Sequence, residues 1–253
     1  MITYGYGCTN CQVYPCSQLH YPLFINRFIF ITSLYKFLLW QLAIKSKKKV
    51  AKKEKQVIII AMKGHPGTGK TTLAESIATA LKLPLLDKDD VRDSTSTLQH
   101  TLPASSASTL LNDLSYDVVF RIASTQVRLG LSVIIDSPLS RRTHLDRLVH
   151  VASSAGARLL VVECKPKDEG EWRRRVEWRG GGDGEAASWH KPASWSDMER
   201  LLEGYGGSTE YEFGDVPRLV VDTTADVPVG DLVSRVVEFV DFHATGSGGS
   251  FVI

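Results

Sequence analysis

Cysteine is scarce in this 253-residue chain and lies almost entirely at one end. Three of the four cysteines, Cys8, Cys11 and Cys16, fall in the first sixteen residues, so a fold stapled by disulfides is excluded. Cys8 and Cys11 could begin a zinc site with Cys16 and His20, but no second C-x-x-C pair follows them. A leader with reduced cysteines and no metal is therefore favoured.

A strong excess of positive charge is also missing from most of the chain. The net charge is +2, yet residues 1–55 hold nine Lys and Arg against one Glu, and the remainder holds 21 against 27 acidic residues. Sequence-independent nucleic-acid binding depends on neutralising many phosphates, so an acidic body argues against it. With 43% hydrophobic and 23% charged residues, the composition is that of a globular protein with one α/β core.

One long hydrophobic run is present, at residues 23–44, and seven lysines follow it within 45–55. A membrane-spanning anchor with a cytoplasmic enzyme is one interpretation. Arg27 and Lys36 oppose it, because each charge costs about 2.5–3.5 kcal/mol near the centre of a span. An interfacial helix with a polybasic flank is the second alternative. The third is that this leader is not part of the natural protein, since the catalytic fold needs nothing before about Gln56. We expect a cytoplasmic protein without a true span, with membrane association through the leader left open.

The informative stretch is Gly64 to Thr71, which satisfies the P-loop pattern G-x-x-x-x-G-K-[ST]. A β-branched run at 57–62 precedes it and an apolar helical stripe at 70–82 follows, which is the strand-loop-helix context that the motif requires. Glycines let backbone N–H groups surround phosphate oxygens at a helix N-terminus. Lys70 would reach the β- and γ-phosphates of ATP, and the Thr71 hydroxyl would ligate Mg²⁺. The predicted nucleotide-binding residues are Gly64, His65, Pro66, Gly67, Thr68, Gly69, Lys70, Thr71 and Thr72.

Short apolar runs alternate with amphipathic stretches from Gln56 onward, which predicts a doubly wound α/β fold. The expected strands are 57–62, 84–87, 131–136, 158–164 and 218–222. The expected helices are 70–82, 108–129, 140–155, 168–178, 196–203 and 229–243. Segments 94–107 and 180–195 are expected to be loops over the site. The predicted organisation is a leader at 1–55, a kinase-like domain at 56–243 with a lid at about 168–195, and a flexible tail at 244–253.

A second cluster of charged residues, Asp87 to Arg92, directly follows the apolar run 83–86. Ligands of open α/β sheets bind beyond the carboxyl ends of the strands, so a second substrate would meet the γ-phosphate here. Asp89 could accept the proton of an attacking hydroxyl, and Arg92 could hold the acceptor. The alternative is a helix N-cap with solvated charges.

Asp136 ends the predicted buried strand Val133 to Ile135, as the acidic residue of a Walker B segment does. It would hold Mg²⁺ through water. The next residue is Ser137 rather than the glutamate with which many P-loop ATPases polarise water, and this favours phosphoryl transfer over hydrolysis. The alternative is a strand-end aspartate that caps the helix after Pro138.

Arginines are concentrated in the predicted helix that leads into the glycine-rich stretch 180–184. Arg175 and Arg179 are four residues apart and share a helix face. Such arginines can close over a transferring phosphoryl group, with the glycines as hinges. The alternative is a solvated basic face paired with Glu171 and Glu177.

Together these segments resemble the AAA-type P-loop kinases grouped with the kinase domain of phage polynucleotide kinase, zeta toxins and chloramphenicol phosphotransferase. The resemblance covers roughly residues 56–243. It implies a three-layer α/β/α P-loop NTPase fold with a mainly parallel five-stranded sheet and a small lid. It also implies that Asp89 is the general base, that Arg92 touches the acceptor and that Arg175 matches the catalytic lid arginine. The lid is longer here, with His190-Lys191-Pro192, so substrate identity does not carry over.

The sequence therefore predicts a Mg²⁺- and ATP-dependent kinase that acts on a hydroxyl of a small molecule or nucleotide. The predicted catalytic residues are Lys70, Asp89, Arg92, Arg175 and Arg179, and the predicted metal ligands are Thr71 and Asp136. A polynucleotide 5′-hydroxyl kinase is the alternative acceptor class. A nucleoside triphosphate hydrolase and a nucleotide-binding module without turnover are the alternatives in reaction class. Nothing in the sequence indicates an oligomeric state.

Overall fold

The computed structural model describes residues 56–181 and 190–244. The cysteine cluster, the hydrophobic run 23–44 and the glycine- and serine-rich tail lie outside these ranges, so the predictions made for them stay predictions. Across the two described ranges, no helix is both long enough and apolar enough to cross a membrane.

A five-stranded sheet forms the centre of the described domain, and every strand pairing in these residues is parallel. The spatial order is β2-β3-β1-β4-β5. The strands are β1 Ile58–Lys63, β2 Leu85–Asp87, β3 Val133–Asp136, β4 Arg158–Cys164 and β5 Arg218–Val221. All five predicted strands are confirmed, with their ends shifted by at most two residues.

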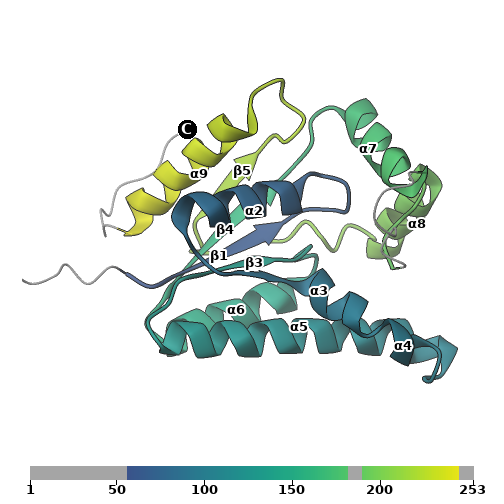
Figure 1. Cartoon of the computed structure of the whole chain (residues 1–253), viewed down its shortest axis with the longest axis horizontal. Coiled ribbons are helices and arrows are strands. Elements are labelled where there is room, and N and C mark those ends of the chain that lie inside the picture. The colour runs from purple at the N-terminus through teal and green to yellow at the C-terminus, as the bar shows by residue number, and fades with distance from the viewer. Residues whose placement is uncertain (1–55, 182–189, 245–253) are drawn as a thin grey trace, which may run out of the picture. The chain divides into compact units, whose positions relative to one another are not determined.

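Helices cover both faces of this sheet, which gives the predicted three layers (Figure 1). Successive side chains of a strand point to opposite faces of the sheet, and those of β1 follow this rule. Ile58, Ile60 and Met62 pack with α2 and α9, whereas Ile59 and Ala61 pack with α5 and α6. The covering helices are α2 Lys70–Leu81 and α9 Val229–Ala244 on one face, and α5 Ala104–Arg128 and α6 Arg142–Ser154 on the other.

The segment predicted as a lid, at about 168–195, contains α7 Glu169–Gly181 and the first residue of α8 Trp195–Tyr205, and these two helices are called the lid helices below. Val176, Trp195 and Met198 form a separate small core between these two helices. Ser194 begins α8 through a capping box, because its side chain accepts a hydrogen bond from the backbone N–H of Asp197 while the Asp197 carboxylate accepts one from the Ser194 N–H. The lid is thus held by its own contacts.

The expected loop at 94–107 is wrong in part. It contains α4 Ser96–Gln99 and the first turn of α5, which begins four residues before the predicted start. Pro103 starts α5, since its carbonyl accepts the N–H groups of Ser106 and Ala107. A further helix, α3 Lys88–Ser94, was not among the expected helices. Asp87 initiates it by accepting the Asp89 N–H at 2.7 Å, as the N-cap alternative proposed.

Candidate active site

The phosphate-binding loop joins β1 to α2 and depends on glycine backbone geometry. Gly64, Gly67 and Gly69 have φ angles of 149°, 79° and 77°. A Cβ on Gly64 would lie 2.7 Å from the carbonyl oxygen of Cys164, and one on Gly67 would lie 2.6 Å from Val176 Cγ2. The sequence can therefore follow this path only with glycine at these positions.

The N-terminus of α2 carries no side-chain cap. Gly69 occupies the cap position in the left-handed region, and its carbonyl accepts the N–H of Leu73. The first N–H groups of a helix have no partner within the helix, and a helix N-terminus in this state favours binding of an anion such as phosphate. Lys70, Thr71 and Thr72, which begin the helix, all line a pocket.

Lys70 forms a buried ion pair with Asp136. Its Nζ lies 2.5 Å from Asp136 Oδ1, and the Asp136 side chain is fully buried. Burial works against the charged amine, but the carboxylate outweighs it and raises the pKa of Lys70. The other Asp136 oxygen, Oδ2, is buried without a hydrogen-bond partner among the described residues. An acceptor atom left in this state next to a phosphate site suits a cation or its water.

Asp87 is a second acidic group beside this pair. It ends β2 as Asp136 ends β3, and the two residues are in register across the strands. Burial, reinforced by the negative charge of Asp136, raises the pKa of Asp87 to about 6. These two carboxylates share one nearby lysine, Lys70, which pairs with Asp136. Further positive charge at this place would stabilise the ionised form of both carboxylates.

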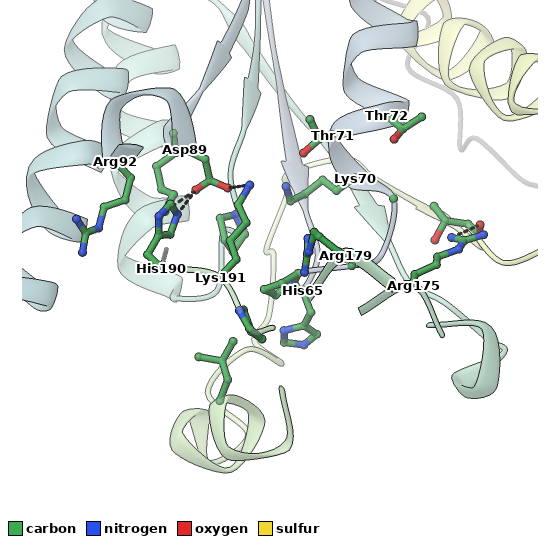
Figure 2. A pocket seen from close by; sticks show the side chains of 18 of the residues that line it. His65, Lys70, Thr71, Thr72, Asp89, Arg92, Arg175, Arg179, His190 and Lys191 are labelled. Atoms are coloured by element: carbon green, nitrogen blue, oxygen red, sulfur yellow. Dashed lines mark hydrogen bonds and ion pairs between the residues drawn. The ribbon is translucent and has the colours of Figure 1, made fainter. Parts of the chain in front are cut away.

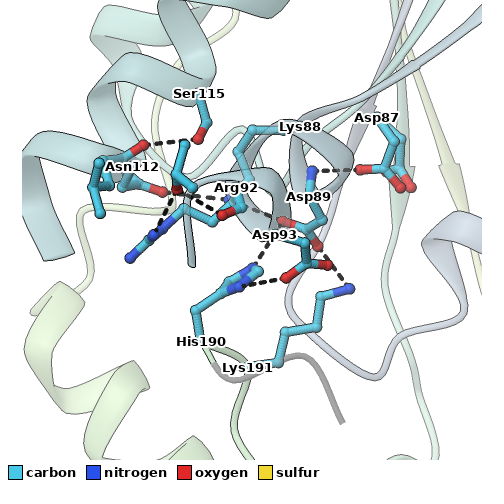
Figure 3. Close-up of polar contacts among 12 residues, drawn as sticks. Asp87, Lys88, Asp89, Arg92, Asp93, Asn112, Ser115, His190 and Lys191 are labelled. Atoms are coloured by element: carbon cyan, nitrogen blue, oxygen red, sulfur yellow. Dashed lines mark hydrogen bonds and ion pairs between the residues drawn. The ribbon is translucent and has the colours of Figure 1, made fainter. Parts of the chain in front are cut away.

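Asp89, the predicted base, enters the pocket from the first turn of α3 and is held by two lysines and a histidine (Figures 2 and 3). Lys88 Nζ lies 2.9 Å from Asp89 Oδ1, and Lys191 Nζ lies 2.8 Å from Oδ2. His190 Nε2 lies 3.3 Å from Oδ1, while its Nδ1 lies 3.2 Å from Asp93 Oδ1. Burial alone would raise the pKa of Asp89, but these partners hold it well below its usual range.

Arg92 lies at the side of the pocket and is almost fully buried. Its guanidinium donates to Thr95 Oγ1 at 3.1 Å and to Gln99 Oε1 at 3.3 Å. Burial lowers the pKa of Arg92. These contacts hold α3 against α4. The predicted contact of Arg92 with an acceptor stays a prediction.

The two lid arginines of α7 differ in their partners. Arg175 pairs with Glu171 Oε1 at 2.7 Å and donates to the carbonyl of Thr223 at 3.0 Å. Arg179 points into the pocket (Figure 2), and its Nε and one terminal nitrogen are buried without a partner in the described residues. Burial lowers the pKa of Arg179. Its guanidinium is therefore available for an anionic group in the pocket.

The lid rests directly on the phosphate loop. Trp172 of α7 donates from its indole Nε1 to the Pro66 carbonyl at 2.9 Å, and its ring stacks on His65 with centroids 6.0 Å apart. Burial lowers the pKa of His65, which favours the neutral form of the ring. The loop and the lid helix are thus positioned together.

Comparison with known families agrees with this geometry. The AAA domain family matches residues 59–204, from the first strand to the second lid helix. The chain belongs to this family. The match spans more than half of the chain and includes the P-loop, Asp89, Asp136 and both lid arginines.

Solved structures show the fold of this AAA domain. A protein from Chloroflexus aurantiacus assigned as a kinase superposes with a TM-score of 0.59 at 23% identity, over 73% of this chain and 98% of its own. A sugar kinase from Janibacter gives 0.52 at 20% identity, over 77% and 99%. A gluconokinase from Sinorhizobium meliloti gives 0.51 at 19%, over 76% and 96%. No curated protein sequence matches the chain. At these identities the likeness establishes a P-loop kinase-like fold, and the acceptor is not specified.

The structure brings most of the predicted site residues of this AAA domain into one pocket, whereas Gly64, Thr68 and Asp136 do not line it. A cavity of about 640 Å³ is lined by Lys70, Thr71, Asp89, Arg92, Arg175 and Arg179. Asp136 lies beneath it through its pair with Lys70. Sequence reasoning placed Asp87 in the charged cluster but did not predict its position beside Asp136, with which it is in register across the strands. It also missed the contacts that Lys88, His190 and Lys191 make with Asp89, because no sequence motif marks these three residues as its partners.

Proposed function

We propose that this protein is an ATP- and Mg²⁺-dependent kinase that transfers the γ-phosphoryl group of ATP to a hydroxyl group of a small molecule or nucleotide. The observation that carries the proposal is that a phosphate-binding helix N-terminus and the carboxylate of Asp89 line the same cavity. A nucleotide-binding module needs only the first of these. A transferase also needs a group that accepts the proton of the attacking hydroxyl.

The side chains present fit a Mg²⁺ ion. The described residues contain no group of three or more His, Cys, Asp or Glu side chains able to hold a metal, which agrees with the usual binding of Mg²⁺ by one or two protein oxygens together with phosphates and water. The buried, unpartnered Oδ2 of Asp136 supplies one such oxygen. Thr71 and Asp136 would hold the ion, which would add positive charge at the phosphates.

The protein's own groups account for the remaining requirements of transfer. The α2 N-terminus and Lys70 bind the phosphates, and Arg179 neutralises charge on the phosphoryl group as it moves. The acceptor oxygen forms a bond to the γ-phosphorus, while the bond from that phosphorus to the bridging oxygen breaks and ADP leaves with its electron pair. Asp89, ionised because of its cationic partners, orients the hydroxyl and takes its proton.

Hydrolysis receives less support from the residues around Asp136. The next residue, Ser137, is buried, and its hydroxyl has no partner in the described part of the chain. It cannot act as the carboxylate that polarises water in many P-loop hydrolases. Asp89 is the carboxylate that lines the pocket, and its place beyond the end of β2 suits a second substrate.

The test is an acceptor panel with the purified full-length chain, ATP and Mg²⁺. We expect ADP release that depends on one class of acceptor and that falls strongly in Asp89→Asn. Labelled-phosphate transfer to short DNA and RNA with free 5′-hydroxyls belongs in the same panel, because it decides between the two acceptor classes. Release of ADP at one rate with every acceptor and with none, unchanged in Asp89→Asn, would exclude transfer.

A further inference from the structure

The pocket is far more basic than the domain around it. Beyond residue 55 the chain carries 21 Lys and Arg against 27 Asp and Glu, yet among the described residues that line the pocket Asp89 is the one carboxylate. The basic residues of the same lining are Lys70, Lys88, Arg92, Arg141, Arg175, Arg179 and Lys191. Positive charge is therefore concentrated where ligands bind, against the trend of the domain.

The nucleotide accounts for only part of this charge. Lys70 belongs to the phosphate loop, and the two arginines of α7 lie over it, so these three groups suit the triphosphate. Four basic residues remain. Lys88 and Arg92 come from α3, Arg141 precedes α6 and Lys191 precedes α8, so they reach the pocket from three separate parts of the chain. The side chain of Arg141 makes no hydrogen bond or ion pair with any described residue.

The positive charge in direct contact with Asp89 exceeds the negative charge of its carboxylate. Its single carboxylate lies within 3 Å of two ammonium groups, those of Lys88 and Lys191 (Figure 3). Lys88 is nearly buried and is also held by Asn112 Oδ1 at 3.3 Å, so it is fixed in place. Lys191 is more exposed, with 26% of its side chain accessible, and comes from the lid side. It is the group that can leave Asp89 and bind a ligand instead.

Neutral polar groups complete the same region. Ser108, Thr109 and Asn112 of α5 line the pocket with hydroxyl and amide groups. Such groups suit the hydroxyls of a sugar-like compound. The cavity of about 640 Å³ must also hold the phosphates of ATP, so the part of the acceptor that lies inside it is compact.

We propose that the acceptor is a compact hydroxylated anion, bearing a carboxylate or a phosphate ester, and that Lys191 selects it by binding that negative group. This inference rests on the proposed kinase function and names its substrate class. Lys191 then has two states. It pairs with Asp89 when the acceptor is absent, and it binds the acceptor's anionic group when Asp89 receives the hydroxyl.

The first experiment compares matched acceptors with the full-length chain, ATP and Mg²⁺. The pairs are D-galactonate with galactitol, D-glycerate with glycerol, and ribose 5-phosphate with ribose, so that charge changes while the hydroxylated chain is kept. We expect kcat/KM to be at least tenfold higher for the anion of a pair that is used. The carboxylates and the phosphate ester distinguish the two sources of charge. Equal or better use of the neutral member, or faster transfer to a DNA or RNA 5′-hydroxyl, would overturn the inference while leaving the kinase function intact.

The second experiment assigns the preference to Lys191. Lys191→Gln should raise the KM for the anionic acceptor by roughly ten- to a hundredfold, the loss expected for one charged hydrogen bond, and should leave the KM for ATP unchanged. Lys191→Arg should restore most of the preference. Lys82→Gln is the matched control, because it removes the same charge from the exposed residue that caps the far end of α2. An equal change in both variants would contradict the role of Lys191.

A binding measurement keeps the inference testable if no acceptor in the panel is phosphorylated. That result would count against the proposed function for these compounds. Thermal unfolding of the protein with ADP and Mg²⁺ should still show stabilisation by D-galactonate or ribose 5-phosphate, none by galactitol or ribose, and a loss of the effect in Lys191→Gln. No stabilisation by any of the anions would overturn the anionic subsite.

Discussion

The two sides of the pocket differ in how their polar groups are satisfied. On the nucleotide side, the first N–H groups of α2, Asp136 Oδ2 and two nitrogens of Arg179 have no partner in the described residues. On the acceptor side, Arg141 has no partner among the described residues, but the groups around the predicted base hold one another, as Asp89 does with Lys88, His190 and Lys191. The first side is ready for a ligand, whereas the second must exchange internal contacts for those of the acceptor. Nucleotide binding should therefore tolerate changes on the acceptor side, and acceptor use should not.

The largest effect should come from the nucleotide side. Lys70→Met removes the phosphate ligand and leaves Asp136 buried without its counter-charge. We expect kcat/KM to fall about a thousandfold, as for loss of a main electrostatic group, and the free energy of unfolding to fall by about 3–5 kcal/mol. Steady-state kinetics and denaturant unfolding check the two effects.

A matched buried pair provides the control for Lys70. Lys63 Nζ lies 2.6 Å from Glu163 Oε1, both side chains are 5% exposed, and neither residue lines the pocket. Lys63→Met should also destabilise the protein, by less than Lys70→Met because Arg218 Nη1 stays 3.1 Å from Glu163 Oε2, and without the catalytic loss per folded molecule. Equal loss of activity in both variants would show that the Lys70 effect is structural.

Asp89→Asn should separate the two sides most clearly. Transfer should fall by roughly 10²–10⁴, the usual contribution of a general base, while the affinity for ATP stays within a few-fold of the unchanged protein. Asp90→Asn, which alters the exposed neighbouring carboxylate, should have little effect on either quantity. Nucleotide titration alongside acceptor kinetics makes the comparison. A parallel loss of ATP affinity in Asp89→Asn would contradict the division into two sides.

The sequence predicts the nucleotide side better than the acceptor side for a physical reason. P-loop residues are contiguous, and their function comes from backbone geometry that glycine permits, so Gly64 to Thr72 can be found from the pattern alone. The contacts of Asp89 join residues about a hundred positions apart, and nothing in the sequence links Asp89 to His190 or Lys191. The short helix α3 was missed because its charged sequence has no apolar stripe.

The two arginines of α7 provide a further test of which groups act on the nucleotide side of the pocket. The family resemblance favours Arg175 as the catalytic arginine, whereas of the two α7 arginines it is Arg179 that has two buried nitrogens without a partner in the described residues. Arg179→Met should lower kcat about a hundredfold. Arg175→Met should lower kcat about tenfold or less, since Arg175 is tied to Glu171 and to the Thr223 carbonyl. Single-turnover rates with saturating ATP measure both. The reverse order would assign the role to Arg175.

The smallest effect concerns Asp87 and its pH dependence. Its raised pKa of about 6 means that the folded protein binds an extra proton between about pH 4 and pH 6. Stability from this group is therefore greatest below that window and is lost as the pH rises through 6. Asp87→Asn should remove this loss, stabilising the ligand-free protein at pH 7.5 by about 1–2 kcal/mol after allowance for solvent screening, and by much less at pH 4.5.

Mg²⁺ and ATP should reverse the sign of the Asp87 effect. Positive charge at the phosphates favours the ionised carboxylate, so stabilisation by Mg²⁺ and ATP should weaken below about pH 6. ATP itself titrates near this range, and Asp87→Asn is the control because it should remove only the part that the protein contributes. Identical pH profiles in both proteins would exclude Asp87 from the nucleotide side.

The most direct test of the account is the fate of the γ-phosphoryl group. Phosphorus NMR of the full-length chain with ATP, Mg²⁺ and its best acceptor follows ADP, inorganic phosphate and the new phosphate ester in one sample. We predict that ADP and the ester form in equal amounts, that inorganic phosphate stays at background, and that Asp89→Asn suppresses both products together. Inorganic phosphate formed in step with ADP, at a rate independent of acceptor and unchanged in Asp89→Asn, would contradict phosphoryl transfer to a hydroxyl.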